Sequence, residues 1–482
     1  MSKLISRRDF LRTGALTAAG VALGACAPAA TPAVVKETVV VPVEETVVVE
    51  KTVVVEATEA PAPTEVPLLS GPIEGHVVCM HFLHEFTEDQ VSAFESENPG
   101  ITLEVVEADL TRFFAMYAAG SPPDLLRVQA PSIPQYLARK MLYDLTPFFE
   151  ASTMLRLEDL APANNYYKAY GPLEIGEGPI YGMCKDFSPD FTIFVYKPLF
   201  EQAGLEVPSD TEPMTYVQIA DQGARLAKFE GDRAVVFGYH YETSWVDRIM
   251  MNMLAEVGES IFTSDMTKLV LKDNEAAYEV AKYYYDLAVN KVSQSIINPS
   301  TTGWFGNDFT AGTLGMAQYG FWFGAMAESD VTKGGVIMIP GPTWAGKRRD
   351  LTMTATGMIM AGATKVPEAA WKVFEYYNAG QPAIDRAGSG WGVPALKSMY
   401  NLIPNSTEYE QQKLRVLQAE LEVMETVPPL QFNPFLGETT VAQSWGTQLD
   451  RALLGEITFD EALTNIEEEV NAAIKDGVDR LL

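Results

Sequence analysis

The sequence predicts a mixed α/β fold with a largely parallel sheet in the part of the chain after residue 72. Two observations lead to this class. Apolar runs typical of buried strands occur at residues 77–82, 101–106 and 124–128. Segments with helical spacing of apolar residues separate these runs, so strand and helix alternate along the chain. The alternation predicts right-handed βαβ units.

The first strand and the first helix have clear limits in the sequence. Residues 77–82 read Val-Val-Cys-Met-His-Phe, an almost unbroken apolar run. The helix is predicted over residues 88–98, because Val91 and Phe94 share one face and Pro99-Gly100 ends the pattern.

The next elements repeat the same order. A second strand is predicted over residues 101–106, and the helix after it contains Phe113 and ends at Gly120. A third short strand follows at residues 124–128. Ligands of such sheets bind beyond the carboxyl ends of the strands, so the residues that follow each strand are the first candidates for a site.

Composition excludes several classes of protein. The 482 residues include 64 acidic and 35 basic side chains, for a net charge of −29. A nucleic-acid binder needs a basic face, and docking on anionic lipid needs basic clusters, so neither partner is expected. With three cysteines, a disulfide-stapled scaffold is excluded as well.

Residues 1–26 are predicted to be an export signal. Arg7-Arg8 precedes an apolar run at residues 13–25, which is too short to span a bilayer core of about 30 Å. The arginine pair resembles the signal of the Tat route. Leu-Gly-Ala-Cys at residues 23–26 resembles a bacterial lipobox, in which Cys26 becomes lipidated. The resemblance implies an extracytoplasmic protein that is anchored to the membrane by lipid.

The segment from residue 27 to residue 72 is predicted to be a disordered, acidic tether. It consists almost entirely of Pro, Thr, Val, Glu and Ala, and Thr-Val-Val-Val recurs at Thr38, Thr46 and Thr52. Its Val runs favour strands, which leaves a short added β-hairpin as the alternative. It has no aromatic residue, however, and so it buries too little surface to offset ordering.

Cysteine and histidine give weak signals in this chain. Cys79 and His81 share a strand face, which is the geometry of two metal ligands, but no constellation of further ligands accompanies them. We expect no metal site and no cofactor. Pairing of Cys79 with Cys184 in an oxidising compartment stays open.

Phe94 to Ile101, Phe-Glu-Ser-Glu-Asn-Pro-Gly-Ile, resembles a stretch of the family 1 extracellular solute-binding proteins, the lipid-anchored receptors of bacterial ABC importers. Residues 80–84 stand where this family usually has a tryptophan, which implies a ligand other than maltodextrin. Further stretches resemble the family's motifs in the family's order: residues 118–124, 143–147, 181–183, 199–205, 309–317, 367–371 and 454–463.

The resemblance implies a two-lobed periplasmic-binding-protein-like fold of type II, with a hinge between the lobes. Lobe one would take residues 73–185 and 340–388, and lobe two residues 186–339 and 389–482. The implied function is to capture a carbohydrate-like solute in the interlobe cleft and deliver it to an ABC permease, without catalysis. The motifs of common nucleophile and nucleotide sites are missing from the sequence, in keeping with this.

Three tryptophans are candidate platforms for a sugar ring. Trp322 occupies the turn in which the resemblance implies a ligand-stacking aromatic residue. Trp391 has glycines on both sides, and Trp245 follows a polar loop. Tryptophan is commonly buried, so a core role is the alternative for each. Trp371 has that role, because it shares a predicted helix with Phe374 and other apolar residues.

Polar candidates complete the predicted site. Asp186 follows the hinge strand, where the resemblance implies a carboxylate that accepts hydrogen bonds from sugar hydroxyls; the alternative is an Asp that caps a turn. Gln129 follows the third strand, and His84 and Glu85 follow the first.

Two other functions remain open from the sequence. A lipoprotein glycoside hydrolase or lyase would need two carboxylates about 5–10 Å apart across the cleft. A receptor for a polyamine or a metal would suit the acidic composition and would use aromatic rings around a cation.

Overall fold

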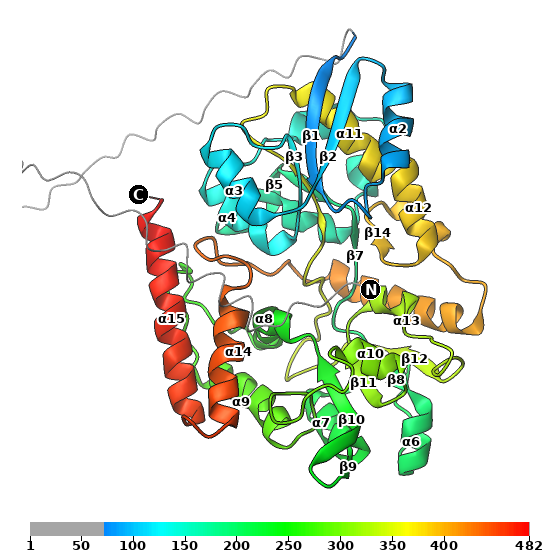
Figure 1. Ribbon diagram of the computed structural model, residues 1–482, viewed down its shortest axis with the longest axis vertical. Coiled ribbons are helices and arrows are strands. Elements are labelled where there is room, and N and C mark those ends of the chain that lie inside the picture. The colour runs from blue at the N-terminus through cyan, green and yellow to red at the C-terminus, as the bar shows by residue number, and fades with distance from the viewer. Residues whose placement is uncertain (1–71, 482) are drawn as a thin grey trace, which may run out of the picture. The chain divides into compact units, whose positions relative to one another are not determined.

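The computed structural model describes residues 72–481 (Figure 1). The export signal 1–26 with Cys26, and the tether except for its last residue, lie outside the described residues. Within 72–481, two mixed sheets of five strands each carry the fold. In spatial order the first sheet contains β2 (Ile101–Glu107), β1 (Gly75–His81), β3 (Leu125–Val128), β13 (Gly357–Met360) and β6 (Gly182–Cys184). The second contains β12 (Val336–Ile339), β8 (Ile193–Tyr196), β11 (Leu314–Gln318), β10 (Arg233–Tyr241) and β9 (Lys228–Glu230).

The α/β prediction is confirmed, and the predicted strands lie within two residues of the observed ones. β1 pairs in parallel with β2 and β3, as the βαβ units require. The expectation of largely parallel sheets is wrong beyond these strands. β13 is antiparallel to both β3 and β6, and in the second sheet β8 is antiparallel to β11 and β12. The chain enters β13 directly from the second sheet, without a crossover helix, and so nothing imposes a parallel direction.

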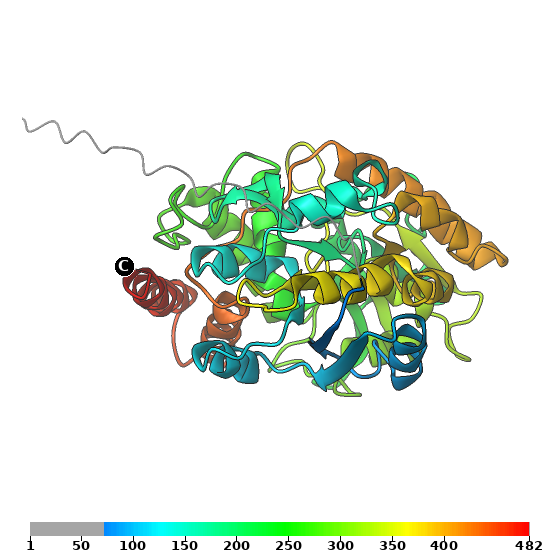
Figure 2. The same ribbon diagram turned by 90° about the horizontal axis from the view of Figure 1, so that it is seen from above.

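Helices cover both sheets. α11 packs on β1 and β13, α7 on β10, and α13 on β12. Figures 1 and 2 show α14 and α15 side by side as a pair of consecutive helices, and α14 also contacts α8 and α9. Near the first sheet are α2 (Glu88–Glu97), α3 (Leu110–Ala118), α4 (Ile133–Ala138), α5 (Thr146–Ala151), α11 (Pro367–Ala379) and α12 (Gln381–Ser389). The others are α6 (Lys197–Ala203), α7 (Tyr216–Leu226), α8 (Val246–Ala255), α9 (Glu275–Val289), α10 (Phe305–Thr310), α13 (Glu408–Glu425), α14 (Thr440–Leu453) and α15 (Phe459–Asp479).

Local sequence explains where several helices begin. Thr87 caps α2: its hydroxyl accepts from the backbone N–H of Gln90, whose side chain accepts from the backbone N–H of Thr87. The same reciprocal capping box begins α15, with Thr458 and Glu461. Each box satisfies two N–H groups that the first turn of a helix leaves without partners. No helix within residues 72–481 is long and apolar enough to cross a membrane.

Trp371 occupies the core position that its helix pattern predicts. It is completely buried and stacks on Phe148 and Phe374, at ring-centroid distances of 5.1 and 5.2 Å. It therefore packs α11 against α5 beside the first sheet.

Two crossovers lead from a strand of one sheet to a strand of the other, and buried carboxylates connect these two crossovers. The chain leaves the first sheet after β6 and returns from β12 to β13. Asp190 of the first crossover accepts from the backbone N–H of Met353 (2.6 Å) and from the Thr352 hydroxyl (3.2 Å). Asp350 of the second accepts from the backbone N–H of Phe191 at 2.9 Å. These bonds align the two segments at the centre of the molecule.

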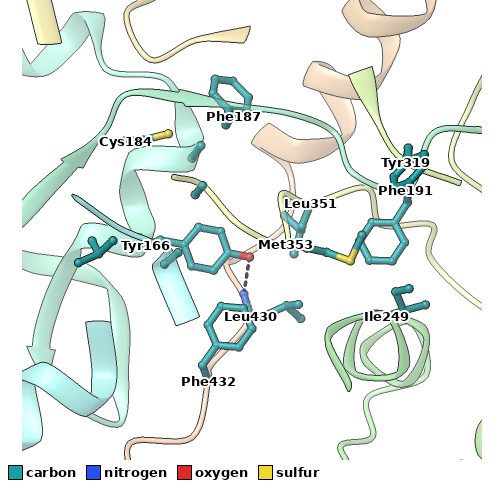
Figure 3. Close-up of a cluster of buried hydrophobic side chains, with 14 of the residues drawn as sticks. Tyr166, Cys184, Phe187, Phe191, Ile249, Tyr319, Leu351, Met353, Leu430 and Phe432 are labelled. Carbon is teal, nitrogen blue, oxygen red and sulfur yellow. Dashed lines mark hydrogen bonds between the residues drawn. The ribbon is translucent and has the colours of Figure 1, made fainter. Parts of the chain in front are cut away.

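Apolar side chains pack around these crossovers. Figure 3 shows Phe191 and Met353 next to Ile249 of α8, while Tyr166 and Phe432 lie at the other end of the same cluster. The Tyr166 hydroxyl accepts a hydrogen bond from the backbone N–H of Leu430 at 3.1 Å, drawn as the dashed line in Figure 3. Segments from both sheets thus share one continuous core.

Both described cysteines are free thiols. Cys79 lies on β1 and Cys184 on β6, and two strands separate them in the first sheet. Because neighbouring strands are about 4.8 Å apart, the two residues are roughly 14 Å apart. A disulfide requires Cα atoms within about 7 Å, so the pairing that the sequence left open does not form.

Candidate functional site

A cavity of about 450 Å³ opens where the end of β1, the start of β7 (Asp186–Phe187) and α12 meet. We call it the hinge cavity. Its volume is typical of sites for small molecules. Four of the predicted site residues line it, namely His84, Glu85, Asp186 and Trp391. The complete lining is His84, Glu85, Thr87, Gln90, Lys185, Asp186, Ala325, Pro382, Asp385, Arg386, Ser389 and Trp391.

The three candidate tryptophans form one continuous row. The ring centroid of Trp322 lies 5.6 Å from that of Trp391 and 6.4 Å from that of Trp245. Trp391 is 45% exposed, whereas the other two are half-buried. Residues far apart in the chain therefore present one aromatic surface, which begins in the hinge cavity and continues into the second sheet's loops.

Buried groups hold this row in position. Trp322 lies in the short helix η5 (Phe321–Ala325), and its backbone N–H donates to the Ser188 hydroxyl at 3.3 Å. Tyr319, completely buried, contacts Trp322 with a centroid distance of 4.9 Å, and its hydroxyl donates to Glu242 at 3.3 Å. A platform supported from behind in this way loses little freedom when a ligand stacks on it.

Glu85, Lys185 and Asp186 bring opposite charges to the lining of the hinge cavity, and Arg127 pairs with Glu85 from outside the lining. Arg127 donates to Glu85 through Nε at 2.9 Å, and the Lys185 ammonium lies 2.6 Å from an Asp186 oxygen and 3.7 Å from Glu85. Burial acts to raise the pKa of Glu85, but Lys185 and Arg127 outweigh it and lower that pKa to about 2. Glu85 is therefore an ionised carboxylate that is already engaged with cations.

Asp186 pairs with one cation, Lys185, whereas Glu85 lies close to two, Arg127 and Lys185. Asp186 lies in β7 (Asp186–Phe187), which pairs with β14 (Val393–Pro394) just after Trp391. Gly392 passes so close that a Cβ there would lie 3.1 Å from the Cβ of Asp186. The absence of a side chain at Gly392 thus allows Asp186 and Trp391 to share one wall.

Sequence reasoning missed two cations of this cavity, Lys185 and Arg386. The Arg386 guanidinium lies 4.3 Å from the centre of the Tyr377 ring and donates to the Tyr377 carbonyl at 3.0 Å. Its Nε and Nη1 atoms have no partner among the described residues. The signals were available, because Lys185 precedes Asp186 and Arg386 lies on the helix that leads to Trp391.

Of the two remaining polar candidates, His84 lines the hinge cavity and Gln129 lies outside it. Gln129 does not line the hinge cavity: its side-chain oxygen accepts from Arg248 of α8 at 3.2 Å, and Arg248 also donates to the Met353 carbonyl at 2.9 Å. Gln129 therefore connects the end of β3 to α8. His84 is exposed at the rim and stacks on Phe82, with ring centroids 5.4 Å apart.

Cys79 and His81, which share a strand face like two metal ligands, are both completely buried. Burial lowers the pKa of His81 to about 3 and raises that of the Cys79 thiol well above its usual range. Among residues 72–481, no group of three His, Cys, Asp or Glu side chains is placed to hold a metal ion.

Known proteins resemble this chain over most of its described length. The family model of the bacterial extracellular solute-binding proteins matches residues 83–379. A binding protein of Brucella abortus (strain 2308) is 25% identical over 304 residues, which are 60% of this chain and 68% of that protein.

Solved structures share the fold. An ABC substrate-binding protein of Listeria monocytogenes in complex with cycloalternan has a TM-score of 0.67 and 21% identity, over 84% of this chain and 100% of that one. A solute-binding protein of Thermotoga lettingae TMO bound with α-D-tagatose has a TM-score of 0.63 and 18% identity, over 83% of this chain and 100% of that one.

These likenesses confirm the predicted two-lobed fold of the periplasmic binding proteins. The family model covers more than half of the chain. The protein therefore belongs to the bacterial extracellular solute-binding proteins, a family of binding proteins that act outside the cytoplasm.

Proposed function

We propose that this protein captures a carbohydrate-like solute on its tryptophan row and in the hinge cavity, and delivers it to the permease of an ABC importer. The observation that carries the proposal is the row Trp245–Trp322–Trp391, which ends beside the carboxylate of Asp186. A sugar ring has apolar faces that stack on aromatic rings and hydroxyl groups that donate to carboxylates. Similar structures hold cycloalternan and α-D-tagatose, which supports the same class of ligand here.

Each residue has a distinct role in the proposal. Trp322 is the central platform, because rings flank it on both sides. Asp186 accepts hydrogen bonds from ligand hydroxyls, while Arg386, which also lines the cavity, contributes positive charge beside the ligand. His84 closes the rim, and Glu85 holds Arg127 and Lys185 in place.

We propose a lobe division that follows the sheets. Residues 73–185 and 340–388 include every strand of the first sheet, and residues 186–339 include every strand of the second. Lobe two would also take residues 389–482. Closure of such lobes around a ligand is the usual motion of periplasmic binding proteins.

The proposed activity includes no chemical conversion. A glycoside hydrolase needs one carboxylic acid that is protonated near neutral pH, with its pKa raised. The Lys185 and Arg127 cations have the opposite effect on Glu85, whose pKa is lowered to about 2. Of the carboxylates that line the hinge cavity, Glu85 thus fits the role of a structural anion.

The test is a thermal-shift screen of the protein with monosaccharides, oligosaccharides and polyols, followed by titration of tryptophan fluorescence. A ligand that binds the native state raises the melting temperature by mass action. We expect one class of sugar to bind and to be recovered unchanged after prolonged incubation. Consumption of the sugar would establish an enzyme, and a panel without any binder would contradict a carbohydrate receptor.

The bound ligand is expected to compact the protein. Closure of the two lobes lowers the radius of gyration, which small-angle X-ray scattering measures with and without the sugar found in the screen. A non-binding sugar at the same concentration is the control. An unchanged radius at saturation would contradict a hinged receptor.

We also propose that lipid on Cys26 anchors the protein to the membrane. Cys26→Ser should move the protein from the membrane pellet to the soluble fraction, since the lipid supplies nearly all of the membrane affinity. Sugar binding by the released protein should equal that of the wild type, because Cys26 precedes the described domain. Persistent pelleting of the variant would contradict the lipobox assignment.

A further inference from the structure

A second cavity, of about 480 Å³, lies against α14 and shares no residue with the hinge cavity. We call it the α14 cavity. It is bounded by the end of β10, the turn after it, the end of α9 and one face of α14. The lining is His240, Tyr241, Thr243, Ser244, Ala288, Gln294, Ser295, Thr439, Ala442, Gln443, Trp445, Gly446, Leu449 and Asp450.

Helical spacing explains the α14 wall. Ala442, Gly446 and Leu449 recur at intervals of three and four residues, so they share one face of the helix. A Cβ added at Gly446 would meet no atom within 4 Å, so the helix leaves open space at this position. Tyr241 and Trp445 bring two aromatic side chains to the walls.

The lining of the α14 cavity carries a negative charge and no Lys or Arg to balance it. Asp450 is the one carboxylate in the lining, and no Lys or Arg is present there. Across residues 72–481, Asp450 makes no ion pair, although its neighbour Arg451 pairs with Glu456 at 3.5 Å. Partial burial raises the pKa of Asp450, as expected for a carboxylate without a compensating cation.

The histidine in the wall does not supply the missing positive charge. Burial lowers the pKa of His240 to about 3, so its ring is neutral at physiological pH. Its Nδ1 faces the backbone N–H of Gln294 at 3.2 Å and accepts from it. The proton of the neutral ring is therefore on Nε2. The walls thus combine one uncompensated anion with neutral aromatic rings.

We propose that the α14 cavity binds a small organic ammonium ion, with Asp450 as its counter-ion and the rings of Tyr241 and Trp445 around its alkyl groups. Carboxylates attract cations across a half-buried site, and aromatic faces stabilise desolvated ammonium groups. A neutral sugar would leave the carboxylate without a counter-ion, and an anion would be repelled. This site is additional to the proposed sugar site.

The test uses choline as the probe, in isothermal titration of the full chain at low ionic strength. We expect saturable binding that weakens with added salt, and Asp450→Asn should weaken it about tenfold or more. Asp330→Asn removes the same charge from an exposed turn outside the cavity and should leave binding unchanged. The uncharged isostere 3,3-dimethylbutan-1-ol should bind far more weakly than choline.

A second variant fills the space. Gly446→Leu places a side chain in the open volume, and a helix tolerates Leu better than Gly, so the fold should be kept while choline binding is lost. Trp322→Ala should not change choline binding, which separates this site from the sugar site. Equal affinity for the uncharged isostere, full binding by Asp450→Asn or by Gly446→Leu, or loss of binding in Trp322→Ala would each overturn the assignment.

Discussion

Trp322→Ala should weaken sugar binding by one to two decades while leaving the melting temperature of the unliganded protein nearly unchanged. Trp322 is half-buried at the centre of the tryptophan row, where removing the ring takes away the stacking surface. Aromatic platforms contribute about 1–3 kcal/mol per stacked ring, and each 1.4 kcal/mol is a tenfold change in affinity. The measurements are a fluorescence titration with the sugar identified in the screen and a melting curve for each protein.

Trp371→Ala is the matched control, because it removes the same side chain from the core. Trp371 is completely buried between Phe148 and Phe374, so its loss should cost about 3–5 kcal/mol of folding free energy. The folded fraction of that variant should bind sugar with nearly wild-type affinity. A large fall in the melting temperature of Trp322→Ala with an unchanged dissociation constant would give Trp322 a core role instead.

The elements of the first sheet could be predicted because their signals are local. The run of apolar residues at 77–82 overlaps β1 (Gly75–His81), and Val91 and Phe94 identify the inner face of α2. The direction of β13 could not be predicted in this way. It depends on a crossover from the other sheet, and that path leaves no periodicity in the sequence.

In the site, too, the positions that depend on neighbouring residues could be predicted, and the pairs between residues far apart in the sequence could not. The positions of Asp186 and Trp391 beside the hinge follow from the strand end and the glycines around them. The pairing of Glu85 with Arg127 does not, because 42 residues separate the two side chains and each lies in an unremarkable context. Gln129 likewise lies after a strand, as predicted, but its partner Arg248 comes from a helix 119 residues away.

The buried carboxylate of Asp190 should lower the free energy of unfolding at pH 8 relative to pH 5, and Asp190→Asn should remove this contribution to the pH dependence. Asp190 is completely buried and accepts two hydrogen bonds from the second crossover, without a cation as its principal partner. Burial raises the pKa of Asp190 from 3.8 to about 7. An Asp in the unfolded chain titrates near 3.9.

The direction of this pH dependence follows from the number of protons that the native and unfolded states bind. Between pH 4 and 7 the native state holds a proton on Asp190 that the unfolded chain has released, so the free energy of unfolding falls as the pH rises through this window. Above pH 7 the Asp190 carboxylate is ionised in the native state, and the full free-energy cost of burying its charge lowers the stability. Each unit of pKa shift corresponds to about 1.4 kcal/mol, which makes the penalty on the order of a few kcal/mol.

Asn is the informative substitution because it keeps the acceptor for Met353 and Thr352 and has no proton to release. In urea unfolding at pH 5 and pH 8, the unliganded Asp190→Asn variant should match the wild type at pH 5 and exceed its stability at pH 8. Other titrating groups contribute equally to both proteins, and Asp330→Asn controls for the loss of one surface charge. Parallel pH profiles for wild type and Asp190→Asn would mean that Asp190 is ionised throughout this range, and that hydrogen bonds from the second crossover stabilise its charge.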